Sequence, residues 1–345
     1  MGDAGLTATI DLEKLLTPVS DEAPAGTDLE YDPIFGDMER AAEGKEEQEF
    51  GDTVIPAEDP DWRELKKRAL QVVEQSKDLR AAVHLTRALM HTDGFAGFAD
   101  GLSLIKGYIE NYWESLHPQL DPEDNNDPTL RINTLINLCD PIDTLGAVSK
   151  IPLVSSTVMG KYSYRDIQIA LGNLQATDAD NQEVALDQVD AAFRECPSEE
   201  SQRTLSQIRA AIESVTGIES RLNELVGVDN APNLQSLTEH LTLLEKEVAT
   251  RTGVDIPAEG SSPDGSGAAA QQQGSSPGVI NSRDDVISAL ERINQYYRKH
   301  EPSSPIPLLL DRAKRLVKMD FYEIVQDLAP DGMQQFDFLW KQEDR

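Results

Sequence analysis

The sequence predicts an all-α protein: an N-terminal helical domain with an extended Pro/Gly arm, a helical hairpin in the middle region, a flexible linker and a small C-terminal helical module. Two observations predict this organisation. Apolar residues recur at helical spacing along most of the chain, as at Leu65, Ala69, Val72 and Val73. Residues 257–278 are almost entirely Gly, Ser, Pro, Ala and Gln, a composition that behaves as a flexible coil. We therefore expect four segments, at residues 1–165, 166–256, 257–281 and 282–345.

The chain is strongly acidic. Its 345 residues include 62 acidic and 31 basic side chains, a net charge of −31. This charge repels nucleic acid and anionic membrane surfaces, which bind cationic faces, so we expect no nucleic-acid partner and no direct membrane insertion. No apolar run approaches the ~18 residues of a membrane helix, and no signal peptide is recognised. Cys139 and Cys196 form no framework and fit a reducing compartment, so we expect a cytoplasmic protein.

Residues 15–40 predict an extended arm. Pro18, Pro24 and Gly26 interrupt any helix or central strand. An apolar side that could pack on a helical body is formed by Leu29, Tyr31, Ile34, Phe35 and Met38. Asp32-Pro33 is typical of a helix start, with Asp at the N-cap and Pro at the first helical position. An ordinary surface loop is the alternative interpretation.

The remainder of the N-terminal domain is predicted to be helical, with glycines at a helix junction. One helix spans residues 78–90, and a second ends near Leu116. Gly94, Gly97 and Gly101 lie between and within them. No Lys-Ser/Thr of a phosphate-binding loop accompanies these glycines, so they indicate close packing of helices.

Five shorter segments have less regular patterns. Residues 131–145 and 164–171 predict helices, and residues 151–158 predict a short extended piece. The acidic run at 43–52 is interpreted as a solvated loop. The acidic loop at 118–128 lacks the ligand spacing of an EF-hand, so calcium binding is not expected.

Two apolar stripes predict an antiparallel helical hairpin in the middle region. Apolar residues from Leu205 to Leu225 share one helical face, and those from Leu234 to Val248 repeat at intervals of three and four. Residues 227–233 form the turn. The hairpin could pack on its own domain or pair with another subunit, and the sequence leaves both possibilities open.

The C-terminal module predicts three short helices. The first begins near Ser282, and its apolar seam consists of Val286, Leu290, Ile293 and Tyr297. A Pro-rich turn at 301–307 leads to a second helix at 308–319, whose inward side consists of Leu309, Ala313, Leu316 and Val317. Asp320 caps a third. A module this small is near the lower limit for an independent core, which makes it a candidate for self-association.

No pattern for catalysis or cofactor binding is found. The sequence has neither a nucleophile elbow nor a dinucleotide fingerprint. His84 and His91 are close enough to share a helical face, but no ligand set of a zinc site accompanies them. We expect neither an enzyme nor a cofactor nor a metal. A hydrolase or metal-dependent enzyme is the alternative, which stoichiometric metal in the pure protein would favour.

Four aromatic residues are candidates for partner binding, because aromatic side chains dominate both cores and binding hot spots. Tyr31 and Phe35 lie on the arm, where core and interface are equally expected. Trp62 and Trp113 have helical apolar neighbours, which favours the core over an interface.

The arm contains the ordered motif Leu-x-Pro-Val-Ser-x-x-x-Pro-x-Gly-x-Asp-Leu-x-Tyr-Asp-Pro-x-Phe, which resembles the opening of the ImpA/TssA family of bacterial type VI secretion proteins. Asp61-Trp62, residues 76–80 and Tyr112-Trp113-Glu114 resemble the same N-terminal domain. Further along, Glu-Pro-x-Ser-Pro followed by Leu-Leu-x-Arg-Ala resembles the C-terminal region of many members, which assembles them into rings.

The resemblance implies a cytoplasmic scaffold of the contractile type VI secretion apparatus. Family members form homo-oligomeric rings that contact baseplate, tube, sheath and spike proteins, and the sheath-disassembly ATPase is a further candidate partner. The linker would let the N-terminal bodies reach their partners, and multivalency would raise weak contacts to useful avidity.

A baseplate-associated role is favoured for a chain this short. An adaptor that recruits the disassembly ATPase and a distal sheath cap are the alternatives. The candidate oligomerisation residues are Leu290, Ile293, Tyr297, Pro302, Pro305, Leu309, Arg312 and Leu316.

Overall fold

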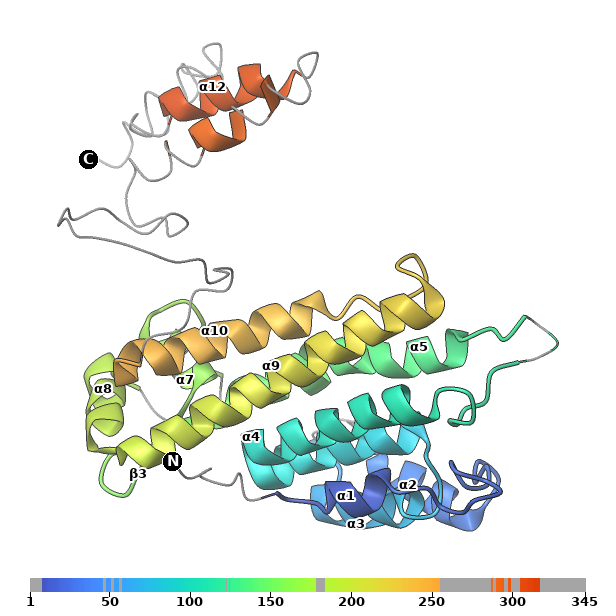
Figure 1. Cartoon of the computed structure of the whole chain (residues 1–345). Helices are drawn as coiled ribbons and strands as arrows, with labels where there is room; N and C mark the ends of the chain where they lie inside the picture. Colours follow the sequence, from blue (N-terminus) through green and yellow to red (C-terminus); the bar gives the residue numbers. More distant parts are fainter. Residues whose placement is uncertain are drawn as a thin grey trace, which may run out of the picture. The chain divides into compact units, whose positions relative to one another are not determined.

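The computed structural model divides into two compact units, Met1–Gly260 and Ser261–Arg345, which are described separately (Figure 1). In the first unit it describes residues 8–254, apart from 46, 47, 51, 52, 56, 57, 122, 124 and 178–183. In the second it describes residues 287, 290–294, 297, 298 and 305–316. The predicted linker at 257–281 and the predicted third helix of the C-terminal module lie outside the described residues.

The first unit is mainly helical, as predicted. Its elements in chain order are α1 (Leu12–Leu16), α2 (Pro33–Ala42), β1 (Gln48–Phe50), β2 (Thr53–Ile55), α3 (Trp62–Val73), α4 (Leu79–Tyr112), α5 (Thr129–Ile136), the 3-10 turn η1 (Asn137–Cys139), the π-helix η2 (Pro141–Gly146), α6 (Ala147–Lys150), β3 (Pro152–Ser156), β4 (Gly160–Ser163), α7 (Tyr164–Ala170), α8 (Leu186–Glu195), α9 (Ser198–Val226) and α10 (Gln235–Thr252). The long helices are stacked in the order α3, α4, α9, α10 (Figure 1).

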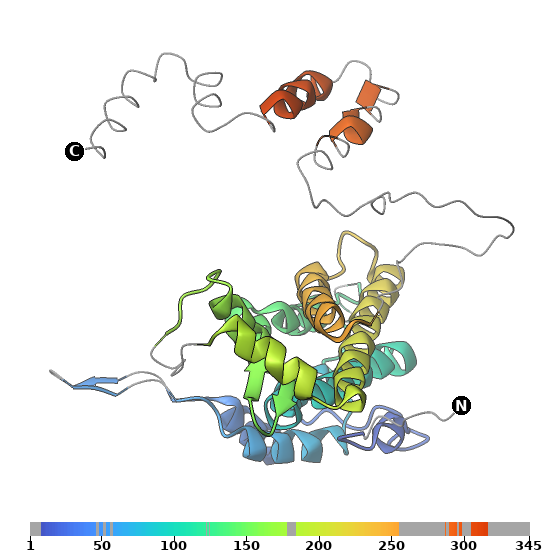
Figure 2. The same ribbon diagram turned by 90° about the vertical axis from the view of Figure 1, so that its left-hand side faces the viewer.

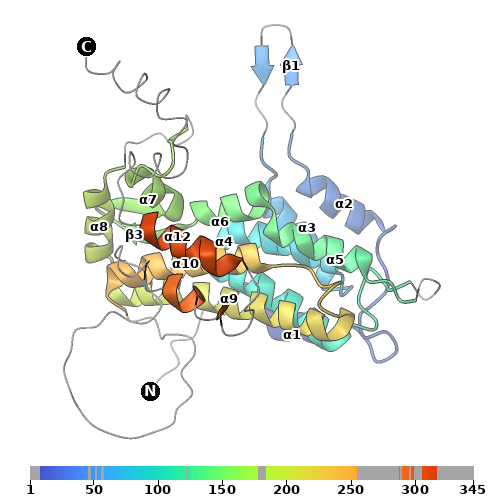
Figure 3. The same cartoon turned by 90° about the horizontal axis from the view of Figure 1, so that it is seen from above.

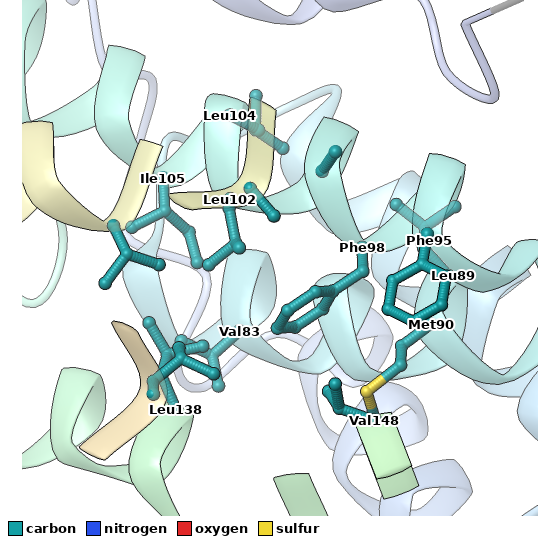
Figure 4. Packing of buried hydrophobic residues seen from close by; sticks show 14 of the residues in the cluster. Val83, Leu89, Met90, Phe95, Phe98, Leu102, Leu104, Ile105, Leu138 and Val148 are labelled. Atoms are coloured by element: carbon teal, nitrogen blue, oxygen red, sulfur yellow. The ribbon is translucent and has the colours of Figure 1, made fainter. Parts of the chain in front are cut away.

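One apolar core joins the two predicted N-terminal segments. Buried side chains of α4, such as Leu102, and of α9, such as Ile208, belong to the same cluster. Figure 4 shows Met90 and Phe98 of α4 in this core, close to Val148 of α6. The expected boundary between residues 165 and 166 therefore does not coincide with a division between compact units, because α9 packs directly on α4.

Gly94 divides α4 into two packed halves. Its backbone is non-helical, with φ 64° and ψ −141°, a conformation that glycine adopts at little cost. A Cβ on Gly97 would lie 2.5 Å from the carbonyl oxygen of Leu89, and one on Gly101 would lie 2.5 Å from the hydroxyl of Thr86. The two halves of α4 therefore pack closely because Gly97 and Gly101 lack a side chain, as the sequence predicts.

The hairpin of α9 and α10 packs on its own body. Its buried apolar residues include Leu205 and Leu222 of α9 and Leu237 and Leu244 of α10. α9 lies against α4 on one side and α10 on the other. Of the two possibilities that the sequence left open, the apolar stripes serve the intrachain core.

Two pairs of antiparallel strands depart from the all-α prediction. β3 pairs with β4 where the sequence predicted only an extended piece. β1 pairs with β2, so the interpretation of residues 43–52 as a loop is wrong in part. Figures 2 and 3 show β1 and β2 extending away from the helices.

The helix predicted at 131–145 is interrupted. α5 ends at Ile136, and Asp140 has φ −57° and ψ 126°. The following Pro141 disfavours a helical conformation at Asp140. The Asp140 side chain then accepts hydrogen bonds from the amides of Ile142 and Asp143 and caps η2.

The arm is anchored to the connection between α3 and α4. The amide of Lys77 donates to the carbonyl of Ala25 at 2.7 Å, and its buried ammonium donates to the carbonyl of Leu15, also at 2.7 Å. Burial lowers the pKa of Lys77. Gly26 has φ +77°, and a Cβ there would lie only 2.2 Å from the carbonyl oxygen of Gln75. Only glycine lets the arm approach this closely.

Asp78 and Arg80 extend the anchorage. The buried Asp78 carboxylate accepts from the Arg80 amide as the N-cap of α4, and also pairs with the Arg80 guanidinium at 2.7 Å. Arg80 reaches Glu30 of the arm at 2.6 Å. The His117 ring contacts the Gly26 carbonyl at 3.2 Å. Four stretches of chain therefore meet at this connection.

Arg131 of α5 holds the end of α4. Its guanidinium is buried and donates to the carbonyls of Trp113 and Leu116, both at 2.5 Å, and of Pro118 at 2.7 Å. These carbonyls follow the C-terminus of α4, where the helix dipole favours a cation. Burial lowers the pKa of Arg131 to about 10, so the side chain remains charged at neutral pH.

Gly26→Ala should destabilise the body because of the clash with the Gln75 carbonyl. Gly172→Ala is a matched control, since Gly172 has φ +76° and nothing within 4 Å of the added Cβ. The control should lose about 1 kcal/mol from left-handed backbone strain alone, and Gly26→Ala about 2 kcal/mol more from overpacking. Urea denaturation of the full chain measures both. Equal losses in the two variants would show that the arm does not require the close approach.

Acid should destabilise the body through His84. Burial, and then the nearby Arg87, lower the pKa of His84 from 6.5 to about 4. Between these values the unfolded chain binds the proton more readily, so the free energy of unfolding should fall as the pH decreases. The loss is on the order of 3 kcal/mol and levels off below about pH 4. His84→Gln cannot titrate, so its urea stability should decline less over this range. A decline as steep as that of the wild type would contradict the assignment.

Candidate interaction surfaces

The two aromatic candidates on the arm point in different directions. Tyr31 is 96% exposed, whereas Phe35 is 1% exposed and lies in the core. The guanidinium of Arg80 lies 4.6 Å from the centre of the Phe35 ring. Phe35 therefore anchors α2 to the body and offers no surface to a partner in this structure. Tyr31 remains a candidate contact residue.

Trp113 also serves the fold. Its side chain is buried and belongs to the core, and Arg131 lies 4.6 Å from its ring centre. The sequence favoured the core for this residue, and the structure places it there. A partner could reach it only by opening the junction between α4 and α5.

Trp62, by contrast, lines an open groove of about 770 Å³. Its indole is partly buried and stacks on the exposed His91 ring, with 3.8 Å between ring centres and 3° between ring planes. The guanidinium carbon of Arg87 of α4 also lies over the indole, 5.9 Å from its ring centre. The groove is bounded by Ala42, Gly44, residues 58–60, α3, α4, η2, α6 and the β3–β4 pair.

Some charged side chains of the groove form ion pairs and others do not. Arg87 pairs with Asp143 at 2.8 Å, and Glu58 pairs with Lys45 at 2.6 Å. Lys150 and Lys161 are exposed lining residues with no ion pair among the described residues.

A single lining carboxylate in the described part of the chain, that of Asp59, has no cationic partner. The charged lining residues of the described chain are therefore three cations and three carboxylates, and among those without a partner the two lysines outnumber Asp59.

Sequence reasoning did not find most of this groove. It named Trp62, but not Arg87, Lys150, Lys161 or the 81% exposed Ile142 of η2. These residues come from four elements, and none of them is part of a recognisable motif in its own segment. Whether the two lysines find an ion-pair partner depends on tertiary structure, so no local pattern could have indicated their unpaired state.

The second unit presents a different surface. Its helix α12 (Ile306–Leu316) has no buried residue among those described. Leu309 was expected to point inward, but its side chain is 63% exposed. Leu308 and Ile293 are also exposed, at 76% and 46%. Leu290 and Leu316 are partly buried. The expectation that Leu309 points inward is therefore wrong for the single chain.

Polar contacts connect α12 to the preceding helical residues. The Asp311 carboxylate accepts from the amide of the buried Asn294 at 2.6 Å and from Arg298 at 2.8 Å. Glu291 pairs with Lys314 at 3.1 Å. Tyr297 and Leu316 are partly buried, Pro305 and Arg312 are exposed, and Pro302 lies outside the described residues.

The described residues contain no group of three or more His, Cys, Asp or Glu side chains arranged to hold a metal ion. Within the same residues, no helix combines the length and apolar character that crossing a membrane requires.

Comparisons with known proteins agree with the features of the arm. The family model described as ImpA, N-terminal, type VI secretion system, matches residues 16–140. The chain is 38% identical to the type VI secretion system component TssA1 of Pseudomonas aeruginosa, over 96% of this chain and 98% of that protein.

A solved structure shares the fold of the first unit. It is the N-terminal domain, including the conserved ImpA_N region, of the TssA component from Burkholderia cenocepacia. The TM-score is 0.57 at 23% identity, and the match covers 73% of this chain and 98% of the solved one. Together with the 38% identity to TssA1 along nearly the whole chain, these matches establish that the protein belongs to the TssA (ImpA) family of type VI secretion system components.

Proposed function

We propose that the protein is a structural scaffold of the type VI secretion apparatus, which assembles through its C-terminal module into a ring of identical chains. The observation that carries this proposal is the exposed apolar face of α12. Leu308 and Leu309 are both more than half exposed on one short helix. A helix of this kind gains stability when another surface covers its apolar residues, and a second copy of the same module is the surface always present.

The candidate residues for assembly are the eight that the sequence predicts for oligomerisation, from Leu290 to Leu316. Of these, Ile293 and Leu309 expose the most apolar surface among the described residues, and Leu290 and Leu316 lie partly buried beside them. Pro305 directly precedes α12, and its carbonyl accepts a hydrogen bond from the amide of Leu308 at 3.2 Å.

The N-terminal bodies would provide the contacts to other components. The expected partners are baseplate, tube, sheath and spike proteins in the cytoplasm, and the exposed Tyr31 and the Trp62 groove are the surfaces offered to them. A ring presents many copies of each surface, so that individually weak contacts combine into useful avidity. The similarity to TssA1 supports membership of such an assembly.

Replacing Leu309 and Leu316 together with Asp should dissociate the ring. Burying two carboxylates in an apolar contact is strongly unfavourable, so the mass measured by light scattering after size-exclusion chromatography should fall to that of a smaller species. Far-UV circular dichroism and the urea transition of the body should remain those of the wild type.

The matched control is Leu130→Asp with Leu243→Asp, two leucines of the first unit that are 64% and 50% exposed. This variant carries the same change of charge and chemistry and should keep the full oligomer. If the Leu309/Leu316 variant retains the wild-type mass, or if the wild type is itself a monomer, assembly does not use this helix.

A further inference from the structure

We infer that the groove at Trp62 is a docking site for an acidic peptide segment with an apolar anchor, supplied by a partner protein. This inference rests on the proposed scaffold function and specifies the chemistry of one of its contact surfaces. Its volume of about 770 Å³ lies within the range of about 300–1,000 Å³ typical of ligand pockets.

The first requirement on an occupant is negative charge. Lys150 at the end of α6 and Lys161 of β4 both line the groove, and neither has a carboxylate partner among the described residues. Arg87 and Glu58 already have partners of their own, at 2.8 Å and 2.6 Å. These two unpaired lysines, offset only in part by the unpaired Asp59, are a feature that a carboxylate-bearing partner would complement.

The second requirement is hydrogen-bond acceptors. Lysine ammonium groups and the indole N–H of Trp62 are donors only. Within the described part of the chain, the Trp62 N–H makes no hydrogen bond. Main-chain carbonyls and carboxylates of an extended peptide supply the matching acceptors.

The third requirement is an apolar side chain. Ile142 is 81% exposed at the groove, and Trp62 presents part of its indole there, held in place by the stacked His91. An aromatic residue fixed by its neighbours beside an exposed aliphatic residue is a typical hot-spot arrangement. A leucine or phenylalanine flanked by Asp and Glu satisfies all three requirements, whereas a small inorganic anion lacks the apolar side chain of the third.

The test uses the full chain and three fluorescein-labelled peptides in an anisotropy titration. The first is Glu-Asp-Leu-Phe-Asp-Glu, the second replaces its four acids with Lys, and the third replaces Leu and Phe with Gly. We expect the first to bind, and the other two to bind at least about tenfold more weakly, because each lacks one of the required interactions.

Variants locate the binding. Lys150→Glu with Lys161→Glu should weaken the first peptide by about tenfold or more, and Ile142→Ser by about threefold to tenfold. The matched control is Arg203→Glu with Lys246→Glu, exposed cations of α9 and α10 that do not line the groove, and it makes the same change in net charge. This control should bind nearly as well as the wild type.

Three outcomes would overturn the inference: no binding of the first peptide, equal weakening by the lysine variant and its control, or equal binding of the first and third peptides. A decrease in oligomer mass caused by Lys150→Glu with Lys161→Glu would also overturn it, by assigning the groove to a second copy. A chain that binds the first peptide as expected but does not form a ring would uphold the groove and refute the scaffold proposal.

Discussion

The hydrogen bonds of the short connection between α3 and α4 are the constraint on which the body depends. The Lys77 amide donates to the carbonyl of Ala25 in the arm, and its ammonium donates to the carbonyl of Leu15 in α1. The Lys77 carbonyl accepts a hydrogen bond from the amide of His117, which follows α4. The adjacent Asp78 caps α4 and pairs with Arg80, whose guanidinium also pairs with Glu30 of the arm. A buried segment must satisfy all its polar groups, and here the satisfying partners come from the arm, α1 and the end of α4. The connection therefore fixes three separate stretches of chain at once.

Buried cations in this acidic protein are held largely by main-chain oxygens. Lys77 donates to one carbonyl and Arg131 to three, and neither forms an ion pair with a carboxylate of the described residues. Carbonyls at the end of a helix carry partial negative charge without requiring the burial of a second ion. Main-chain acceptors thus hold Lys77 and Arg131 in the interior. Lys150 and Lys161 differ, because they are exposed and lack either kind of partner in the described chain.

Local signals in the sequence predicted the helices well. Asp32-Pro33 begins α2 as expected, with the Asp32 side chain accepting from the amide of Ile34. The glycines around residue 94 and the leucine stripes of α9 and α10 also behave as predicted, since each depends on neighbours a few residues away. The paired strands, the shared core of α4 and α9, and the groove at Trp62 were not foreseen. Each arises from residues distant in the chain, whose meeting no local periodicity encodes. Phe35 and Trp113 illustrate the same limit, because an aromatic residue in a motif can be an anchor of the core rather than a contact.

The turn at Gly94 has a consequence for the order in which the body folds. It brings the two halves of α4 together through contacts between near neighbours in the chain, such as Leu89 with Gly97. The bonds of the N-terminal stretch span far more chain, 62 residues between Leu15 and Lys77 and 91 between Thr9 and Asp100. Closing a short loop costs less entropy than closing a long one, so contacts near in sequence form sooner. The paired halves of α4 are therefore suited to act as the nucleus, and the arm joins a framework that is already assembled.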